Sequence, residues 1–296
     1  MDLIVTVPAF LDLTAVGLEG LPRLGEEKFA GDLVRSPGGG AITAVAAVRL
    51  GLSTALVSPL GEDVPGRFVR EELEGEGIVV GGGTTTRMAQ TIVLPCGDDR
   101  AMVTVDPGAR ARASDVQPHL PAGAVAGNLE QLHLVPDGTR MYLTCGSDDA
   151  HAYAGRLPEA ARGADALFID GPDACLLAGA GPDETEAAGA TLASAVRTVI
   201  VTRGAAPPLA WSDGELLPTV DYATGRAVDT TGDVDLLCAS YAWAELRGAD
   251  PRAATEWARL HAALAVTVAT ATAGAVHEDR LLEEGVKRGL VPPGGR

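Results

Sequence analysis

Residues 228–240 read Val-Asp-Thr-Thr-Gly-Asp-Val-Asp-Leu-Leu-Cys-Ala-Ser, a polar turn that leads into an apolar segment. We predict a helix that starts at Asp235 and continues through Leu246. A helix N-terminus presents unpaired N–H groups and a partial positive charge, so it suits phosphate. A carboxylate in the first turn can take a proton from a hydroxyl bound at the same place. The stretch therefore fits phosphoryl transfer to an alcohol, although an Asp-capped helix after a turn has the same pattern.

The rest of the chain alternates short apolar runs with helical patterns. A small-residue helix follows the glycines at 38–40 and ends on Gly51. This alternation favours right-handed crossovers and a mostly parallel sheet with helices on both faces, a three-layer αβα fold. The predicted strands are residues 4–7, 53–59, 131–135, 140–144, 166–170 and 198–202, and the other predicted helices are 65–77, 253–271 and 279–288.

Two segments, about 12–35 and 87–106, do not fit this alternation. Residues 88–94 and 101–105 alternate around the turn Gly97-Asp98-Asp99-Arg100, which is typical of a β-hairpin. We expect a single domain over residues 1–296 in which the two segments form a small β lid over the main sheet. Such a lid has one apolar face, which favours a homodimer through the lid.

Composition and charge narrow the classes of function. The 296 residues are 46% hydrophobic and 21% charged, as in a globular protein. The net charge of −17 argues against a nucleic-acid or anionic-membrane partner. The four cysteines contain no C-x-x-C pair, which argues against zinc or redox use. The N-terminus reads as a strand rather than a signal peptide, and no apolar run reaches transmembrane length, so we expect a cytoplasmic protein.

Several polar groups follow predicted strands or begin predicted helices. In open α/β sheets, ligands bind at the carboxyl ends of the strands. We therefore expect these groups to meet at one rim of the sheet: the 38–40 glycine loop, Asp170, the segment 202–204 and the turn 229–235.

On four motifs in order, the chain resembles the ribokinase-like sugar kinases of the phosphofructokinase-B type, which include fructokinases and nucleoside kinases. The resemblance runs over essentially the whole length. Its motifs are a double glycine, Ala-rich helix and Arg-Leu-Gly at 38–51, Gly-Glu-Asp-Val-Pro-Gly at 61–66, Val-Thr-Arg-Gly at 201–204 and Asp-Thr-Thr-Gly-Asp-Val-Asp at 229–235. The resemblance implies a kinase that uses ATP and Mg²⁺, with K⁺ in some members, on a hydroxymethyl group of a sugar, sugar derivative or nucleoside.

The resemblance also implies roles for particular residues. Asp235 resembles the catalytic base. The anion hole corresponds to Gly232, Asp233 and Val234. The substrate site corresponds to Asp12, Gly38, Gly39 and Thr43, and the nucleotide site to Thr202, Gly204 and Asp170. Asp173 resembles the magnesium ligand that acts through water, and Asp229 and Thr231 resemble the monovalent-cation loop.

The chain departs from the family pattern at the centre of its signature. The family's Gly-Ala-Gly-Asp is Gly-Asp-Val-Asp here, so Asp233 places a second carboxylate beside Asp235. Two like charges about 4 Å apart cost roughly 1 kcal/mol in water and about 4 kcal/mol at an effective dielectric constant near 20. We therefore expect Asp233 to point outward or to hold a metal ion.

Other departures affect the substrate and magnesium sites. Ile42 or Thr43 replaces the family's sugar-binding Asn, depending on the alignment. The Asn-x-x-Glu motif reads Asp170-Gly-Pro-Asp173, and both aspartates also suit helix capping. The glycine expected after the first strand is replaced near Val7, and the one expected three residues after Gly204 is Pro207.

These departures leave two hypotheses open. The first is a working kinase, and the second is a catalytically degenerate homologue that binds a sugar or nucleotide as a sensor or partner protein. Four groups of charged or imidazole side chains are interpreted as structural or solvated rather than catalytic: Asp148 with Asp149, Glu283 with Glu284, Arg87 with Arg100, and His133 with His261. For Arg87 and Arg100 the alternative is that they line the lid, and surface charge on the hairpin is the preferred interpretation.

Overall fold

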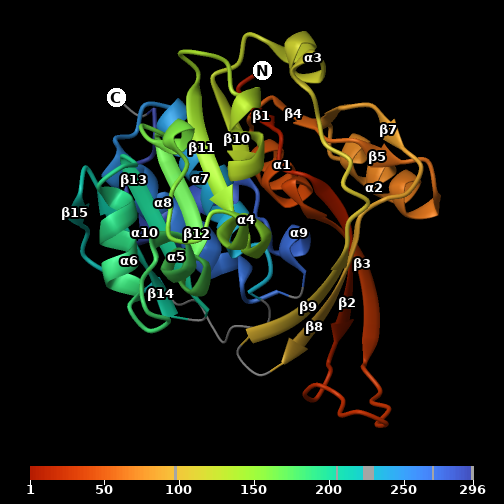
Figure 1. Cartoon of the computed structure of the whole chain (residues 1–296). Helices are drawn as coiled ribbons and strands as arrows, with labels where there is room; N and C mark the ends of the chain where they lie inside the picture. The colour runs from red at the N-terminus through yellow and green to blue at the C-terminus, as the bar shows by residue number, and fades with distance from the viewer. Residues whose placement is uncertain (97–98, 205, 223–229, 269, 295–296) are drawn as a thin grey trace.

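The computed structural model describes residues 1–96, 99–204, 206–222, 230–268 and 270–294, and its largest element is a nine-stranded sheet (Figure 1). The strand order is β15-β14-β13-β12-β11-β10-β1-β4-β6. Pairing is parallel from β13 to β6 and antiparallel at β13–β14 and β14–β15. The strands are β1 (Leu3–Val5), β4 (Thr54–Val57), β6 (Val79–Gly81), β10 (Ala124–Asn128), β11 (Arg140–Cys145), β12 (Ala166–Asp170), β13 (Thr198–Arg203), β14 (Ala206–Ser212) and β15 (Glu215–Leu216).

Helices cover both faces of this sheet, so the predicted three-layer αβα fold is confirmed. Alternate residues of each central strand face opposite layers, as the two-residue period of a strand requires. Tyr142, Phe168 and Ile200 pack toward α7 (Asp233–Leu246) and α8 (Pro251–Ala265). Figure 1 shows the opposite face covered by α4, α5 and α6. These helices span Ser147–Ala152, Gly171–Ala178 and Thr185–Ala193.

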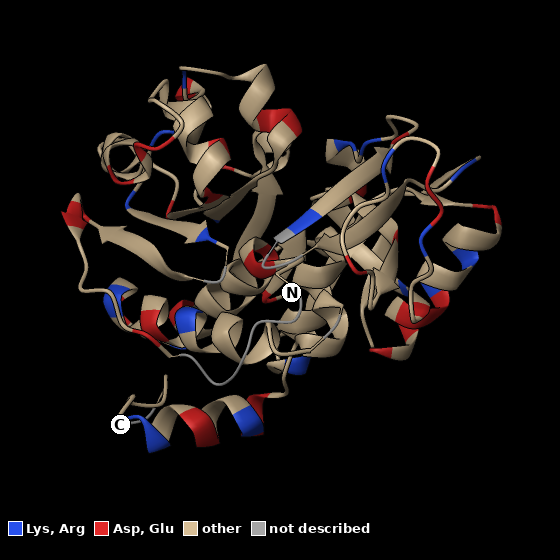
Figure 2. Ribbon diagram, turned by 90° about the horizontal axis from the view of Figure 1, so that it is seen from below, with Lys and Arg blue, Asp and Glu red and all other residues tan. Residues whose placement is uncertain are grey.

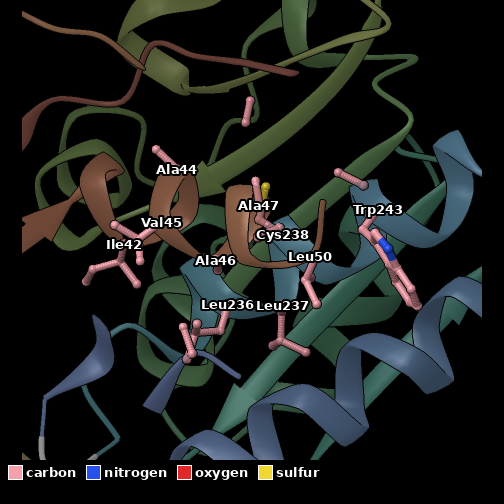
Figure 3. Packing of buried hydrophobic residues seen from close by; sticks show 14 of the residues in the cluster. Ile42, Ala44, Val45, Ala46, Ala47, Leu50, Leu236, Leu237, Cys238 and Trp243 are labelled. Atoms are coloured by element: carbon pink, nitrogen blue, oxygen red, sulfur yellow. The ribbon is translucent and has the colours of Figure 1, made fainter. Parts of the chain in front are cut away.

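Small side chains let α1 (Gly40–Arg49) approach α7 closely. The helix reads Gly-Ala-Ile-Thr-Ala-Val-Ala-Ala-Val-Arg, and its first eight residues are buried. Figure 3 shows Ile42, Val45 and Leu50 of this region packed with Leu236 and Leu237 of α7. Because α7 is buried almost all round, this packing fixes the position of its first turn.

A second, smaller sheet extends away from the main body (Figure 1). Its order is β3-β2-β8-β9, with β2 and β8 parallel and the outer pairs antiparallel. The strands are β2 (Ala9–Val16), β3 (Asp32–Gly39), β8 (Gln90–Cys96) and β9 (Asp99–Val105). The two predicted lid segments therefore do form one sheet, while residues 97–98 of the predicted hairpin turn lie outside the described residues.

The remaining elements connect these layers or close the fold. Acidic and basic residues alternate along α10 near the C-terminus (Figure 2), where Lys287 and Arg288 pair with Glu284. None of the described helices combines the length and apolar composition needed to cross a bilayer. These elements are β5 (Leu60–Gly61), α2 (Val64–Gly75), β7 (Thr84–Thr85), α3 (Ala113–Val116), the 3-10 helices Gln117–His119, Leu129–Leu134 and Glu159–Ala161, α9 (Ala271–Gly274) and α10 (Glu278–Lys287).

One predicted strand was wrong. Residues 131–135 fall in and just after a 3-10 helix, and the strand is instead β10, whose Ala-Val-Ala-Gly-Asn sequence has a weak apolar signal. Asp149 explains the turn, since its carboxylate accepts the N–H groups of Leu129 and Glu130 at 2.9 and 3.1 Å. Asp149, about 20 residues further along the chain, thus ends β10 at Asn128, although the apolar pattern of the sequence continues beyond it.

Other boundaries also moved. The predicted helix 253–271 ends at Ala265, and α9 starts after Thr270, which has φ 69°. A Cβ on Gly274 would lie 2.6 Å from the Ala265 carbonyl oxygen, so α9 folds back directly onto the end of α8. The antiparallel strands β14 and β15 were missed because the two prolines in β14 are unusual in a strand, except at a sheet margin.

Candidate active site

The described residues enclose a pocket of about 260 Å³ between the carboxyl ends of the main strands, the second sheet and the start of α7. The arrangement follows from the parallel topology, because parallel strands all end on the same rim. The structure brings the following predicted site residues to its wall: Asp12, Gly39, Asp170, Asp173, Thr231, Gly232, Asp233, Val234 and Asp235.

The turn before α7 depends on Gly232. This residue is the N-cap of the helix and has φ 75°, a conformation that glycine adopts without strain. A Cβ there would lie 2.6 Å from Ala271 Cβ and 2.9 Å from Ile42 Cδ1. The helix begins at Asp233, two residues earlier than predicted, so both Asp233 and Asp235 lie in its first turn.

Asp235 borders the pocket and is held by α1. Thr43 Oγ1 donates a hydrogen bond to Asp235 Oδ1 at 2.8 Å. Loss of hydration raises the pKa of the Asp235 carboxyl to about 7; the Thr43 hydrogen bond opposes this rise, and the nearby charges of Asp233 and Asp12 add to it. A carboxylate with this pKa can both accept and release a proton near neutral pH.

Asp233 lies inside the cradle. It is 5% exposed, and its Oδ1 accepts the backbone N–H of Val234 at 2.8 Å. Burial raises the pKa of its carboxyl, while Arg100, the Val234 N–H and a hydrogen bond from Thr202 act in the opposite direction. The expectation that Asp233 points outward was therefore wrong, and inside the cradle Arg100 and Thr202 favour its charged form. Its alternative, that Asp233 holds a metal ion, stays a prediction.

The glycine loop lies directly beneath Asp12. A Cβ on Gly38 would come within 2.2 Å of the Asp12 carboxylate, so only glycine leaves room for it. Gly39 has φ 57°, and a Cβ there would lie 2.3 Å from the Phe10 ring. Asp12 is 6% exposed and lines the pocket, whereas Gly38 supports it from behind.

Asp170 and Asp173 lie at the start of α5. Asp170 is its N-cap and accepts the N–H of Asp173 at 2.9 Å, so the capping interpretation holds for it. Asp173 accepts a hydrogen bond from Ser147 Oγ at 3.1 Å, and burial together with the Asp170 charge raises the pKa of its carboxyl to about 6. The described residues contain no cluster of three or more metal-binding side chains. Mg²⁺ bound mainly by phosphates and water needs only one or two carboxylates, so Asp173 fits that ion.

Besides Gly38, three predicted residues lie away from the pocket wall. Thr43 reaches Asp235 instead of the open space, and Thr202 is buried against Asp233. Gly204 follows β13 with φ 57°, outside the lining residues. Of the predicted cation loop, Thr231 lines the pocket, and Asp229 lies outside the described residues.

Sequence reasoning preferred a solvated position for both Arg100 and Asp149. Arg100 lines the pocket, and its Nη1 donates to Thr230 Oγ1 at 3.0 Å, so its interpretation as surface charge was wrong. The signal was the alternation of the hairpin, since Arg100 shares a face with Met102 and Thr104, which also line the pocket. Asp149 is 4% exposed rather than solvated, and burial raises the pKa of its carboxyl to about 6.

Asp148, also set aside as solvated, is exposed and lines the pocket. The remaining side chains set aside as non-catalytic do not line it. His261 is fully buried in α8, accepts the Val276 N–H at 3.0 Å on Nε2 and contacts Ser240 through Nδ1. His133 and Arg87 are exposed. Asn128, which was not considered, lines the pocket with a buried Oδ1 that has no partner among the described residues.

Comparison with known proteins gives a family match over part of the chain and a fold match over nearly all of it. Residues 10–120 match the model of the pfkB family carbohydrate kinases. No curated protein matches the chain in sequence. Among solved structures, a probable sugar kinase protein from Rhizobium etli is 17% identical, with a TM-score of 0.78 and coverage of 98% of this chain and 99% of the other.

Two further structures extend this fold match. The nucleoside kinase of Methanocaldococcus jannaschii is 17% identical, with a TM-score of 0.75 and coverage of 97% and 99%. Ribokinase from Arabidopsis thaliana, complexed with ribose and ATP, is 22% identical, with a TM-score of 0.74 and coverage of 96% and 98%. Identities this low establish a shared fold and leave the substrate open.

Proposed function

We propose that this chain, whose residues 10–120 match the pfkB family of carbohydrate kinases, transfers the γ-phosphoryl group of ATP to a hydroxymethyl group of a sugar, sugar derivative or nucleoside. The observation that carries the proposal is the position of Asp235. It lies in the first turn of α7, borders the pocket and has a carboxyl whose pKa is raised to about 7. A base placed beside a helix N-terminus is what proton removal and phosphate binding jointly require.

In the proposed reaction, Asp235 accepts the proton of the substrate hydroxyl. The hydroxyl oxygen forms a bond to the γ-phosphorus as the bond to the bridging oxygen of ADP breaks. Asp12, supported by Gly38, accepts hydrogen bonds from other hydroxyl groups of the acceptor. Thr43 keeps the Asp235 carboxylate in place through its 2.8 Å hydrogen bond, a role that replaces direct contact with the acceptor.

Magnesium would be held on the α5 side of the pocket. Asp173 supplies the carboxylate, through water, and Mg²⁺ when bound neutralises charge on the phosphates. The pocket carries many aspartates, and the chain has a net charge of −17, so ATP needs this neutralisation to enter. The second sheet covers the pocket with Thr91, Met102 and Thr104, which limits the access of water as a competing acceptor.

A second candidate function is a catalytically degenerate homologue that binds a sugar or nucleotide without turnover. The observation in its favour is Asp233, whose carboxylate already occupies the Val234 N–H in the cradle. A carboxylate there repels an incoming phosphate unless a cation intervenes. The two candidates share the pocket and differ in whether phosphate transfer occurs.

A turnover assay separates them. ADP formation from ATP and Mg²⁺ would be followed with a panel of pentoses, hexoses and nucleosides, together with the thermal midpoint in each mixture. A kinase gives acceptor-dependent ADP, and a sensor gives a raised midpoint without ADP, since a ligand that binds the native state stabilises it. No ADP with any acceptor, together with a raised midpoint, would favour the second candidate.

A further inference from the structure

Asp233 lies where an incoming phosphate would meet the first turn of α7. Its carboxylate is buried, accepts the Val234 N–H at 2.8 Å and receives a hydrogen bond from Thr202. Amides at a helix N-terminus bind anions because their N–H groups lack helical partners. The Val234 N–H is therefore already bound by the carboxylate of Asp233.

Arg100 brings the compensating positive charge from another part of the molecule. It lies in β9 of the second sheet, lines the same pocket and donates to Thr230 Oγ1 at 3.0 Å, just before the turn into α7. Its charge acts on both carboxylates of the first turn, Asp233 and Asp235. A buried carboxylate is costly without a nearby cation, so Arg100 and Asp233 depend on each other.

We propose that Arg100 binds the phosphoryl group that is transferred, and that Asp233 holds Arg100 at the cradle until this group arrives. The inference rests on the proposed function, because the incoming anion is the γ-phosphate of ATP. A guanidinium binds phosphate oxygens through paired N–H groups, so Arg100 can bind a phosphate that arrives beside the Asp233 carboxylate. Arg100 is then a catalytic residue, and Asp233 is a positioning residue that also competes with the phosphate.

The competition sets the affinity for the phosphoryl donor. The Asp233 carboxylate repels the γ-phosphate and competes with it for Arg100 and the Val234 N–H. It therefore lowers the affinity for ATP more than the affinity for ADP, and it leaves the affinity for adenosine unchanged. The positive charge arrives from the second sheet, so it is in place only when that sheet lies over the pocket as it does here. Donor selection therefore depends on two residues that are 133 positions apart in the chain.

The test measures binding of ATP, ADP and adenosine, each with Mg²⁺, by calorimetry. Asp233→Asn keeps the shape and removes the competing charge, so ATP affinity is expected to rise about 3- to 10-fold. Adding Arg100→Ala to this variant is expected to lower ATP affinity about 10- to 100-fold, ADP affinity only a few-fold and adenosine affinity not at all. The Asp233→Asn background is needed because Arg100→Ala alone leaves a buried carboxylate without its cation and can unfold the site.

Arg87→Ala in the same background is the matched control, because Arg87 is exposed and outside the pocket lining; it is expected to change nothing. A kinetic measurement separates positioning from packing: Asp233→Asn is expected to lower the KM for ATP and to leave the KM for the acceptor unchanged.

Three outcomes would overturn the inference. Equal ATP affinity with and without Arg100 in the Asp233→Asn background makes Arg100 a structural counter-ion, and the proposed function stands. An equal loss of affinity for ATP, ADP and adenosine indicates general distortion of the pocket; it likewise removes Arg100 from its proposed role and leaves the proposed function standing. No ATP binding by any variant, including the wild type, overturns the proposed function itself and this inference with it.

Discussion

Burial shifts the pKa values of Asp235 and His261 in opposite directions, and the surroundings of each side chain decide whether it can serve chemistry or structure. Asp235 has open space on one side and a hydroxyl donor on the other, whereas His261 has protein on every side. The same loss of hydration raises the pKa of the acid to about 7 and lowers that of the imidazole to about 3. Only Asp235 can therefore exchange a proton with a ligand.

Asp235→Asn is expected to cut turnover by about 10²- to 10⁴-fold, because it removes the base and keeps an oxygen for the Thr43 hydrogen bond. Wild-type kcat/KM should rise with pH through about 7, as the carboxyl loses its proton. The native pKa lies above the unfolded value, so the stability that this group contributes is lost as pH rises from about 4 through 7.

Between pH 5 and pH 8, the free energy of unfolding of Asp235→Asn, measured with urea, should therefore increase relative to that of the wild type. Asp213→Asn, at an exposed turn outside the pocket, is the matched control and should change neither turnover nor this pH dependence. Turnover of Asp235→Asn within a few-fold of wild type would remove Asp235 from its role.

His261 makes stability sensitive to acid. Its Nε2 accepts the Val276 N–H at 3.0 Å, so protonation would break that contact inside the core. Because burial lowers the native pKa to about 3, the stability from this group is present above about 6.5 and is lost as pH falls toward 3.

The expected loss is roughly 3 kcal/mol by pH 4, measured by urea unfolding. His261→Gln should be less stable at pH 7 but should lose less stability between pH 7 and pH 4 than the wild type. Parallel pH profiles for the two proteins would contradict this assignment.

At the scale of elements, glycines decide how closely helices dock. Gly285 of α10 faces α8, and a Cβ there would lie 2.1 Å from Trp257 Cη2. Gly285→Ala is expected to cost about 1–3 kcal/mol, because the indole must move in a packed core. Gly75→Ala, at the end of α2 with nothing within 4 Å, is the control and should be neutral or up to about 1 kcal/mol stabilising. Denaturant midpoints of the two variants that shift by the same amount would refute the docking argument.

At the scale of the whole molecule, the outer face of the second sheet is apolar. Ile92 and Val103 are cross-strand partners, and with Val105 they are 45%, 59% and 62% exposed, on the side opposite the pocket. We expect a homodimer through this face, since an apolar sheet surface of this kind is normally covered.

Sedimentation at micromolar concentration should show the dimer. Ile92→Glu with Val103→Glu should give a monomer, whereas Val286→Glu, at an exposed position on α10, should leave the dimer intact. A monomeric wild type at that concentration would exclude this face as the interface.

The sequence by itself determined the alternation of strands and helices, the two segments of the second sheet and the position of Asp235 at the start of a buried helix. These features are local: apolar periodicity sets the element type, and glycines with small polar residues set the turns. The glycine loop at 38–40 was predictable for the same reason, but the contact of Gly38 with the Asp12 carboxylate was not, because it depends on the pairing of β2 with β3.

The tertiary structure alone decided which charges face the pocket. Arg100 and Asp149 look like solvated charge in sequence, but the pairing of β8 with β9 turns Arg100 inward, and Asp149 is buried because it ends the strand β10. Asp233 lies inside the cradle, where Arg100 and Thr202, from two other elements, favour its charged form. Contacts between segments this far apart depend on how the two sheets and the helices assemble, and no local pattern of residues encodes them.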